Sequence, residues 1–180
     1  MLEGRKIRLR VMEKGDLSFH LETTNDVSFY GEHGPVTAQM CLSEAEKRFE
    51  NPSPLATICE RARFVIEKKE GTKVGFAAHY LVQPTRLMEI GYGIIPRERG
   101  KGYGTEAVQI MVDYLFLSKD ISRIQAVTNV GNNASQRVLE KAGFKNEGTL
   151  REVGYVRGER TDANVYSILR EEWKEPKILR

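Results

Sequence analysis

A cluster of alternating glycines is the part of the sequence best suited to chemistry. Gly100, Gly102 and Gly104 stand directly ahead of an amphipathic helical pattern. Glycine lacks a Cβ, so such a loop turns sharply and brings its backbone close to a ligand. The first turn of the following helix adds unpaired N–H groups and the positive end of the helix dipole. The spacing therefore predicts an anion site, with a phosphate or pyrophosphate as the expected ligand.

Two nucleotide-binding motifs fit the loop poorly. A nucleotide-hydrolysing P-loop needs Ser or Thr after its lysine, whereas Gly102 follows Lys101. Residues 102–107 satisfy the dinucleotide pattern GxGxxA, but the next expected strand ends near Thr128 without an acidic residue to hold a ribose. A tight turn without any ligand is the plain structural alternative.

Hydrophobic periodicity sets the loop within an alternation of strands and helices. The expected strands cover residues 7–11, 64–67, 74–82, 88–95 and 121–128, with a closing hairpin in 144–170. The expected helices begin after caps at Asp16 and Ser43, after the glycine loop, and near residue 134. This order predicts an α/β fold with a mixed sheet and a strand–helix–strand unit at its centre. Residues 1–180 are expected to form a single domain.

Composition excludes several classes of partner. The net charge is +3 and the basic residues are spread along the chain, so no nucleic-acid partner is expected. No apolar run approaches the roughly 18 residues that cross a bilayer, which predicts a cytoplasmic protein without a membrane partner. Cys41, Cys59 and the histidines lack metal-ligand spacing, so no metal is expected.

Two motifs in the correct order carry a family resemblance. Arg99, Gly102 and Gly104 resemble the acyl-CoA signature of the GCN5-related N-acetyltransferase (GNAT) superfamily. Residues 132–144 (NNASQRVLEKAGF), followed by EGTLRE, resemble the RimJ/RimL-like branch of ribosomal-protein N-acetyltransferases. The similarity covers nearly the whole chain. It implies a GNAT-like fold, with a central splayed mixed sheet flanked by helices, and acetyl-CoA as co-substrate.

The resemblance also implies which residues bind acetyl-CoA. Backbone amides of the loop would hold the pyrophosphate, with Thr105 entering the helix behind them; the loop residues are Arg99, Gly100, Lys101, Gly102, Tyr103 and Gly104. The strand before the loop would pair with the pantetheine arm through Gly93, Ile94 and Ile95. Asn132 would bond the arm from the opposite side. The plain alternative for Asn132 is a helix cap or a turn residue.

Two side chains are the catalytic candidates. Glu89 resembles the general-base glutamate of histone-modifying relatives, although a strand residue that faces solvent or pairs with an arginine is an equal alternative. The thiolate-protonating tyrosine of many relatives falls on Leu139, which leaves Ser135 as the candidate donor or as a helix cap. Binding and alignment alone supply much of the catalysis if neither side chain takes part.

The acceptor is the least specified part of the expected reaction. The resemblance implies transfer of acetyl directly to a primary amine, with a protein N-terminus as one candidate and a polyamine, amino sugar or antibiotic as the rival. A non-catalytic acyl-CoA-binding regulator is the alternative from another class. Homodimers are common among similar proteins. The acceptor groove is expected near Phe29, Tyr30, Glu32, Tyr155 and Arg157.

Overall fold

A computed structural model describes residues 1–31, 33–34, 39–51, 61–82 and 87–179 of the chain. The strands are β1 (Leu2–Glu3), β2 (Ile7–Val11), β3 (Arg61–Lys68), β4 (Lys73–Val82), β5 (Leu87–Ile94), β6 (Arg123–Asn129), β7 (Lys145–Val156) and β8 (Glu159–Leu169). The helices are α1 (Leu17–Thr24), α2 (Leu42–Glu50), α4 (Tyr103–Ser118) and α5 (Asn133–Ala142), with short 3-10 turns η1 (Lys14–Asp16) and η2 (Pro96–Glu98).

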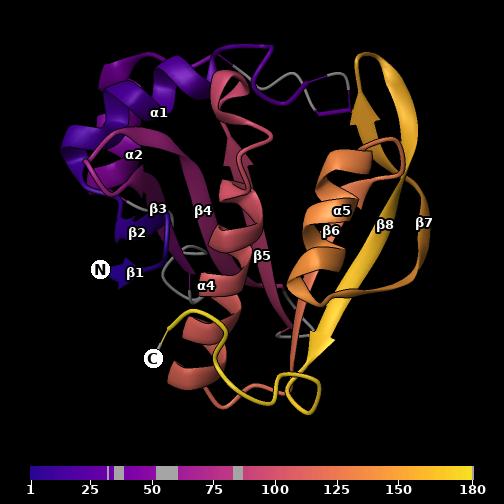
Figure 1. The fold of residues 1–180 in the computed structure, drawn as a ribbon. Coiled ribbons are helices and arrows are strands. Elements are labelled where there is room, and N and C mark those ends of the chain that lie inside the picture. The colour runs from indigo at the N-terminus through magenta and orange to yellow at the C-terminus, as the bar shows by residue number, and fades with distance from the viewer. Residues whose placement is uncertain (32, 35–38, 52–60, 83–86, 180) are drawn as a thin grey trace.

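The described strands form one sheet in the order β1-β2-β3-β4-β5-β6-β8-β7 (Figure 1). Neighbouring strands run antiparallel except β5 and β6, which run parallel on either side of α4 in the chain. This is the strand–helix–strand unit expected from the sequence, and the mixed α/β fold is confirmed. The closing hairpin is also confirmed, because β7 and β8 join through Gly158 at a φ of 92°.

Helix α4 covers one face of the sheet because its apolar side chains recur at helical spacing. Met111, Leu115 and Phe116 are each no more than 3% exposed, and they share a core with Met88 of β5 and Ile124 of β6. Helix α5 lies beside α4 over β6 (Figure 1). Helices α4 and α5 therefore stand on the same face, one on each side of the parallel pair.

Helix α1 packs on the opposite face. The rings of Phe19 and His20 lie 5.1 Å and 4.8 Å from the ring of Phe76 on β4. Phe76 alternates with Ala77, which belongs to the core under α4, so the two side chains point to opposite faces of the sheet.

The described part of the segment after α1 crosses the end of the sheet. Phe29 is buried against β5, where a Cβ added to Gly93 would lie 2.6 Å from its ring. His33 lies against the turn after β6, where a Cβ added to Gly131 would also lie 2.6 Å from the imidazole. In Figure 1 this segment runs above the upper end of β5 toward the β7–β8 hairpin.

The chain after β8 is fastened to α4 by one buried carboxylate. Asp113, 1% exposed, accepts a hydrogen bond from the Trp173 indole at 2.8 Å. It also accepts from the backbone amides of Lys177, Ile178 and Leu179 at 2.7–3.1 Å. These bonds fix the tail against the lower part of α4 (Figure 1), away from the glycine loop at the other end of the helix.

A charged network anchors β2 to the start of α1. Asp16 and Glu67 are 3% and 4% exposed. The Arg10 guanidinium donates to both, at 2.9 Å and 2.8 Å, and the Lys73 ammonium lies 2.7 Å from Asp16. The hydrogen bond from Arg10 is the largest influence on Asp16 and outweighs its burial, so the pKa of this carboxyl lies well below its usual range.

Two local expectations were wrong, and one was right in position only. Ser43 does not cap α2, since Cys41 occupies the cap position and Ser43 lies inside the helix with its hydroxyl 3.2 Å from the Cys41 thiol. Asp16 occupies the expected cap position of α1, but its carboxylate makes no bond to that helix and instead accepts from Arg10 and the Glu13 amide and pairs with Lys73. Strand β6 begins at Arg123, two residues after the expected start.

Within the described residues, no helix is long and apolar enough to cross a membrane. Cys41 is an exposed free thiol, and Cys59 lies outside the described residues.

Replacing Asp16 is expected to make the fold less stable and less sensitive to acid. Asp16→Asn removes the buried counter-charge that Lys73 pairs with and leaves Arg10 with Glu67 alone, at a cost of about 3 kcal/mol in unfolding free energy at pH 7. The lowered pKa of Asp16 stabilises the fold above its unfolded value of about 4, and this contribution is lost as pH falls further. Urea unfolding should show a smaller difference in unfolding free energy between wild type and variant at pH 3 than at pH 7.

The matched control is Glu44→Gln, which also removes one carboxylate from an ion pair. Glu44 pairs with Arg48 on the surface of α2, where both side chains are about half exposed. An exposed pair of this spacing contributes about 0.5 kcal/mol or less. If Asp16→Asn lowered the unfolding free energy equally at pH 7 and pH 3, the stabilising role of the ionised Asp16 carboxylate would be contradicted.

Candidate functional site

A gap opens where β5 and β6 part. The two strands pair only at Met88–Ile124 and Glu89–Gln125. Beyond this point β5 continues against β4 as far as Ile94, and β6 continues against β8. The inner edges of both strands therefore carry backbone N–H and C=O groups that have no partner strand, which is a costly arrangement unless another group pairs with them. This is the splay expected from the family resemblance.

Strand alternation decides which backbone groups face the gap. The Ile95 amide donates to the Val74 carbonyl on β4 at 2.9 Å, so it points away from β6. Gly93 has the same parity and also faces β4. Among the three residues expected to pair with a pantetheine arm, Ile94 is therefore the one whose backbone faces the gap. Its carbonyl accepts a hydrogen bond from Arg99 Nε at 3.0 Å.

The glycine loop forms the expected turn at the start of α4. Gly100 and Gly102 have φ of 76° and 85°, a left-handed conformation that side chains with a Cβ rarely adopt, and Gly102 is the N-cap. The first bond into the helix runs from Glu106 N to the Gly102 carbonyl at 3.1 Å. The amides of Tyr103, Gly104 and Thr105 thus belong to the first turn, where helical partners are absent.

The lysines around the loop differ in how they are neutralised. Lys101 and Lys68 both pair with Glu98, at 2.8 Å and 3.1 Å. Their hydrogen bonds, that of Lys101 first, lower the pKa of the Glu98 carboxyl. A third lysine, Lys6, places its ammonium 3.3 Å from the Lys101 carbonyl. Sequence reasoning missed Lys6 because nothing local links it to a loop 95 positions away.

Glu89 lies at the closed end of the gap, held on both carboxylate oxygens. The Tyr80 hydroxyl of β4 donates to one oxygen at 2.5 Å, and the Gln125 amide of β6 donates to the other at 2.8 Å. These partners replace the arginine considered from the sequence. Partial burial and then the bond to Glu89 raise the pKa of Tyr80 above its usual value, so this hydroxyl stays a donor at neutral pH.

Ser135 and Asn132 share the first turn of α5. Asn132 is the N-cap, and its side-chain oxygen accepts from the Ser135 amide at 3.1 Å. The alternative that Ser135 itself caps the helix is wrong. The capping alternative for Asn132 is observed, and a bond from its amide N–H to a ligand stays a prediction. Leu139, one turn further along, is 1% exposed in the core.

Tyr92 reaches across the gap to Ser135. Its hydroxyl lies 2.9 Å from Ser135 Oγ and 3.1 Å from the Ser135 carbonyl. Burial raises the pKa of Tyr92 to about 12, so the phenol remains protonated. Glu89 and Tyr92 have opposite parity on β5, which puts their side chains on opposite faces of the sheet. The alternation of side chains along β5 could be predicted from the sequence. The contact between Tyr92 and Ser135 on α5 could be found only from the fold.

The face with Glu89 has one filled and one open position. Phe29 covers Gly93, and Arg99 Nη2 donates to the Phe29 carbonyl. A Cβ added to Gly91, between Gly93 and Glu89, would meet no atom of the described residues within 4 Å. None of the described residues therefore fills the space over Gly91, between Phe29 and the carboxylate of Glu89.

The remaining acceptor candidates differ in how far they are buried. Tyr30 is partly buried, and burial raises the pKa of its hydroxyl. Tyr155 is 63% exposed on β7, and Arg157 lies in the β7–β8 turn with a φ of 51°. Glu32 lies outside the described residues. Among the residues that are described, no group of three His, Cys, Asp or Glu side chains could hold a metal ion.

Comparison with known proteins identifies relatives of the whole chain. A family profile described as an acetyltransferase (GNAT) domain matches residues 6–145. The uncharacterized N-acetyltransferase p20 of Bacillus licheniformis is 30% identical over 178 residues, which cover 96% of this chain and 97% of p20.

Two relatives from Bacillus subtilis match over shorter stretches. The uncharacterized N-acetyltransferase YoaA is 42% identical over 60% of this chain and 62% of its own length. YdaF, provisionally named a ribosomal N-acetyltransferase, is 38% identical over 55% of this chain and 54% of its own length. The chain thus aligns with less than two thirds of either protein.

Solved structures share the fold. The spermidine N-acetyltransferase of Vibrio cholerae, in complex with CoA and spermine, has a TM-score of 0.81 at 22% identity, covering 94% of this chain and 99% of its own. RimL, the ribosomal L7/L12 α-N-protein acetyltransferase in complex with CoA, has a TM-score of 0.80 at 17% identity, covering 93% and 97%.

The glycine loop yields a test of ligand binding with an internal control. Gly100→Ala and Gly158→Ala each place a Cβ on a left-handed residue, at φ of 76° and 92°, with no atom of the described part of the chain within 4 Å. Both should lower the unfolding free energy by about 1–2 kcal/mol through backbone strain. Only Gly100→Ala should also weaken the binding of acetyl-CoA, by about tenfold or 1.4 kcal/mol, because relief of the strain moves the loop amides.

The measurement is the rise in melting temperature with increasing acetyl-CoA, since a ligand that binds the native state raises it by mass action. Wild type and Gly158→Ala should show the same rise, and Gly100→Ala a smaller one. Equal rises in all three proteins would mean that the loop does not hold the ligand.

Proposed function

Because the chain belongs to the GNAT acetyltransferase family, we propose that it transfers the acetyl group of acetyl-CoA directly to a primary amine. One observation carries the proposal to this site: β5 and β6 part immediately after Glu89, so a carboxylate stands at the closed end of an unpaired strand edge. We also propose that the reaction takes place in the cytoplasm, since acetyl-CoA is an intracellular metabolite.

The binding of acetyl-CoA is supported by the fit of two features. The loop from Arg99 to Thr105 offers first-turn amides and the positive end of the α4 dipole, which suit a pyrophosphate. The free edge of β5 offers the backbone of Ile94, whose carbonyl accepts from Arg99 and has a second lone pair for an amide N–H of the pantetheine arm. Asn132, on the other side of the gap, bonds the same arm in this proposal.

Glu89 accepts the proton of the incoming amine in the proposed reaction. Acetyl-CoA supplies the acyl group as a thioester, and the amine must lose a proton to attack it. The open space over Gly91 gives an amine access to Glu89 on this face of the sheet. Tyr80 and Gln125 hold the carboxylate in one orientation, which aligns it with an acceptor that enters beside Phe29.

Ser135 donates a proton to the departing thiolate in the proposed reaction. Its hydroxyl stands at the first turn of α5, where the gap meets the helix, and Tyr92 lies within hydrogen-bond distance. With Leu139 buried in the core, no phenol reaches this place from α5 itself. Tyr92 remains protonated because burial raises its pKa to about 12, so it supports the serine as a hydrogen-bond donor.

A protein N-terminus is the proposed acceptor, with a polyamine as the second candidate. The fold shared with RimL and the partial similarity to YdaF support the N-terminus. The fold shared with the spermidine enzyme of Vibrio cholerae, and a carboxylate facing open space, support a cationic amine such as a polyamine. Other small amines, and a regulator that binds acyl-CoA without turnover, are the outcomes that would displace both.

A screen of free thiol release from acetyl-CoA tests the reaction and its acceptor together. Peptides with varied N-termini, polyamines and aminoglycosides serve as acceptors, with each peptide also offered in N-blocked form. Release with free but not with blocked peptides is the expected result. Thiol release with polyamines alone would identify a small amine as the acceptor. Binding of acetyl-CoA without thiol release from any acceptor would indicate a regulator.

Glu89→Gln should slow transfer more at low pH than at high pH. At high pH more of the acceptor amine is already neutral, so the loss of a base costs less. A general base contributes roughly 10² to 10⁴ in rate, and a loss near 10² is expected at neutral pH. The check is the pH profile of kcat/KM, with the stabilisation by acetyl-CoA unchanged as a control for folding. A uniform loss across the profile would assign Glu89 to binding.

A further inference from the structure

Lys6 lies at the glycine loop although it belongs to the turn between β1 and β2. Its Nζ donates to the Lys101 carbonyl at 3.3 Å and would lie 3.6 Å from a Cβ added to Gly102. Gly102 is the N-cap of α4. The ammonium of Lys6 therefore stands at the end of the helix where an anion binds best.

A buried carboxylate fixes this turn in place. Glu106, in the first turn of α4, is 7% exposed and accepts hydrogen bonds from the backbone amides of Lys6 at 2.7 Å and Ile7 at 3.3 Å. Gly4 permits the close approach, since a Cβ there would lie 2.3 Å from the Glu106 carboxylate. The backbone of Lys6 is thus held against α4, and only its flexible side chain is free to adjust.

Lys6 differs from the other lysines at the loop in its charge balance. Lys101 and Lys68 share the carboxylate of Glu98. Within the described residues, no carboxylate lies within ion-pair distance of the Lys6 ammonium. An ammonium has three donors, and only one is used here, on a neutral carbonyl. Lys6 therefore keeps both its charge and two donors for a ligand at the loop.

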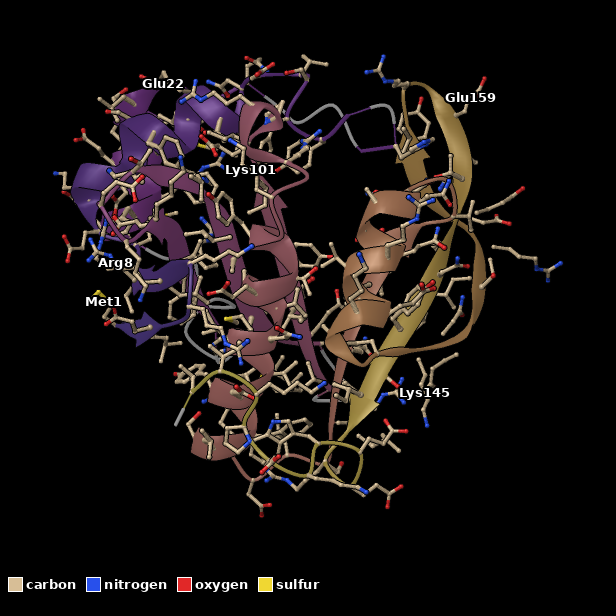
Figure 2. All side chains as sticks on the ribbon, in the orientation of Figure 1. Met1, Arg8, Glu22, Lys101, Lys145 and Glu159 are labelled. Atoms are coloured by element: carbon tan, nitrogen blue, oxygen red, sulfur yellow. The ribbon has the colours of Figure 1, made fainter. Side chains whose placement is uncertain are left out.

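We propose that Lys6 binds the pyrophosphate of acetyl-CoA, closing the anion site from the side opposite the loop amides. The proposal rests on acetyl-CoA as the donor, but not on the identity of the acceptor. An ammonium is a suitable point charge for a phosphate oxygen and adds a full positive charge to a site whose other donors are neutral amides. Figure 1 shows β1 and β2 beside α4, and Figure 2 shows Lys101 near the amino-terminal end of that helix.

The test compares Lys6→Gln with Arg5→Gln. Arg5 is the adjacent exposed cation, so the two variants make the same change in net charge. Dissociation constants are measured for acetyl-CoA, for its dephospho form without the 3′-phosphate, and for acetyl-pantetheine, which has no phosphate diester. Lys6→Gln should weaken the first two by about fivefold and leave acetyl-pantetheine unchanged, because one exposed charge-assisted bond is lost. Lys6→Arg should restore most of the loss.

Each other pattern overturns the proposal in a recognisable way. A loss confined to acetyl-CoA would assign Lys6 to the 3′-phosphate. An equal loss with acetyl-pantetheine, or an equal effect of Arg5→Gln, would indicate a structural or a general charge effect. If Lys6→Gln bound acetyl-CoA as tightly as wild type, Lys6 would not contact the pyrophosphate, although acetyl-CoA would remain the acyl donor. Failure of the wild-type protein to bind acetyl-CoA would remove the donor assignment itself.

Discussion

Parallel pairing between β5 and β6 lasts for two residue pairs, while each strand stays paired along its outer side. Beyond Glu89 and Gln125 the two strands diverge, and each continues along its outer neighbour. Unpaired N–H and C=O groups are left along both inner edges. The two helices that follow β5 and β6 begin beside this gap, so their amino-terminal ends and the free edge of β5 converge. The ligand site, the candidate base and the candidate acid all depend on this divergence.

Two glutamates give the glycine loop its charge balance by doing different work. Glu98 pairs with both Lys101 and Lys68 and neutralises part of their charge. Glu106 instead accepts backbone amides from the β1–β2 turn, which fixes that turn without neutralising Lys6. Of the three lysines Lys6, Lys68 and Lys101, only Lys6 therefore lies at the loop without a carboxylate partner among the described residues. Such a site binds an anion with little rearrangement of its main chain.

The sequence predicted what depends on short stretches of chain. The glycines needed at left-handed positions, the amphipathic α4 and the closing hairpin are all encoded locally, and the splay was expected from the family resemblance. What it missed depends on contacts between distant segments. Gln125 and Tyr80 meet Glu89 only through strand register, and Lys6 meets the loop only through Glu106. The wrong cap at Ser43 has a similar origin, since Cys41, which is not a favoured capping residue, begins α2 instead.

The candidate base and acid approach the gap from opposite faces of the sheet. Glu89 shares its face with Phe29, and Ser135 stands on the face covered by α4 and α5. An amine that enters on one face and a thiolate that is protonated from the other is an arrangement suited to direct transfer.

Leu139 clarifies how the acid side of this arrangement is built. It lies one turn after Ser135 on the same side of α5, and helical side chains lean toward the amino terminus. A tyrosine at 139 would therefore extend toward Ser135. In this chain Leu139 fills the core instead, and Tyr92 delivers a phenol to Ser135 from the neighbouring strand. The phenol beside Ser135 is thus anchored on β5, the strand that also carries Glu89, and not on α5.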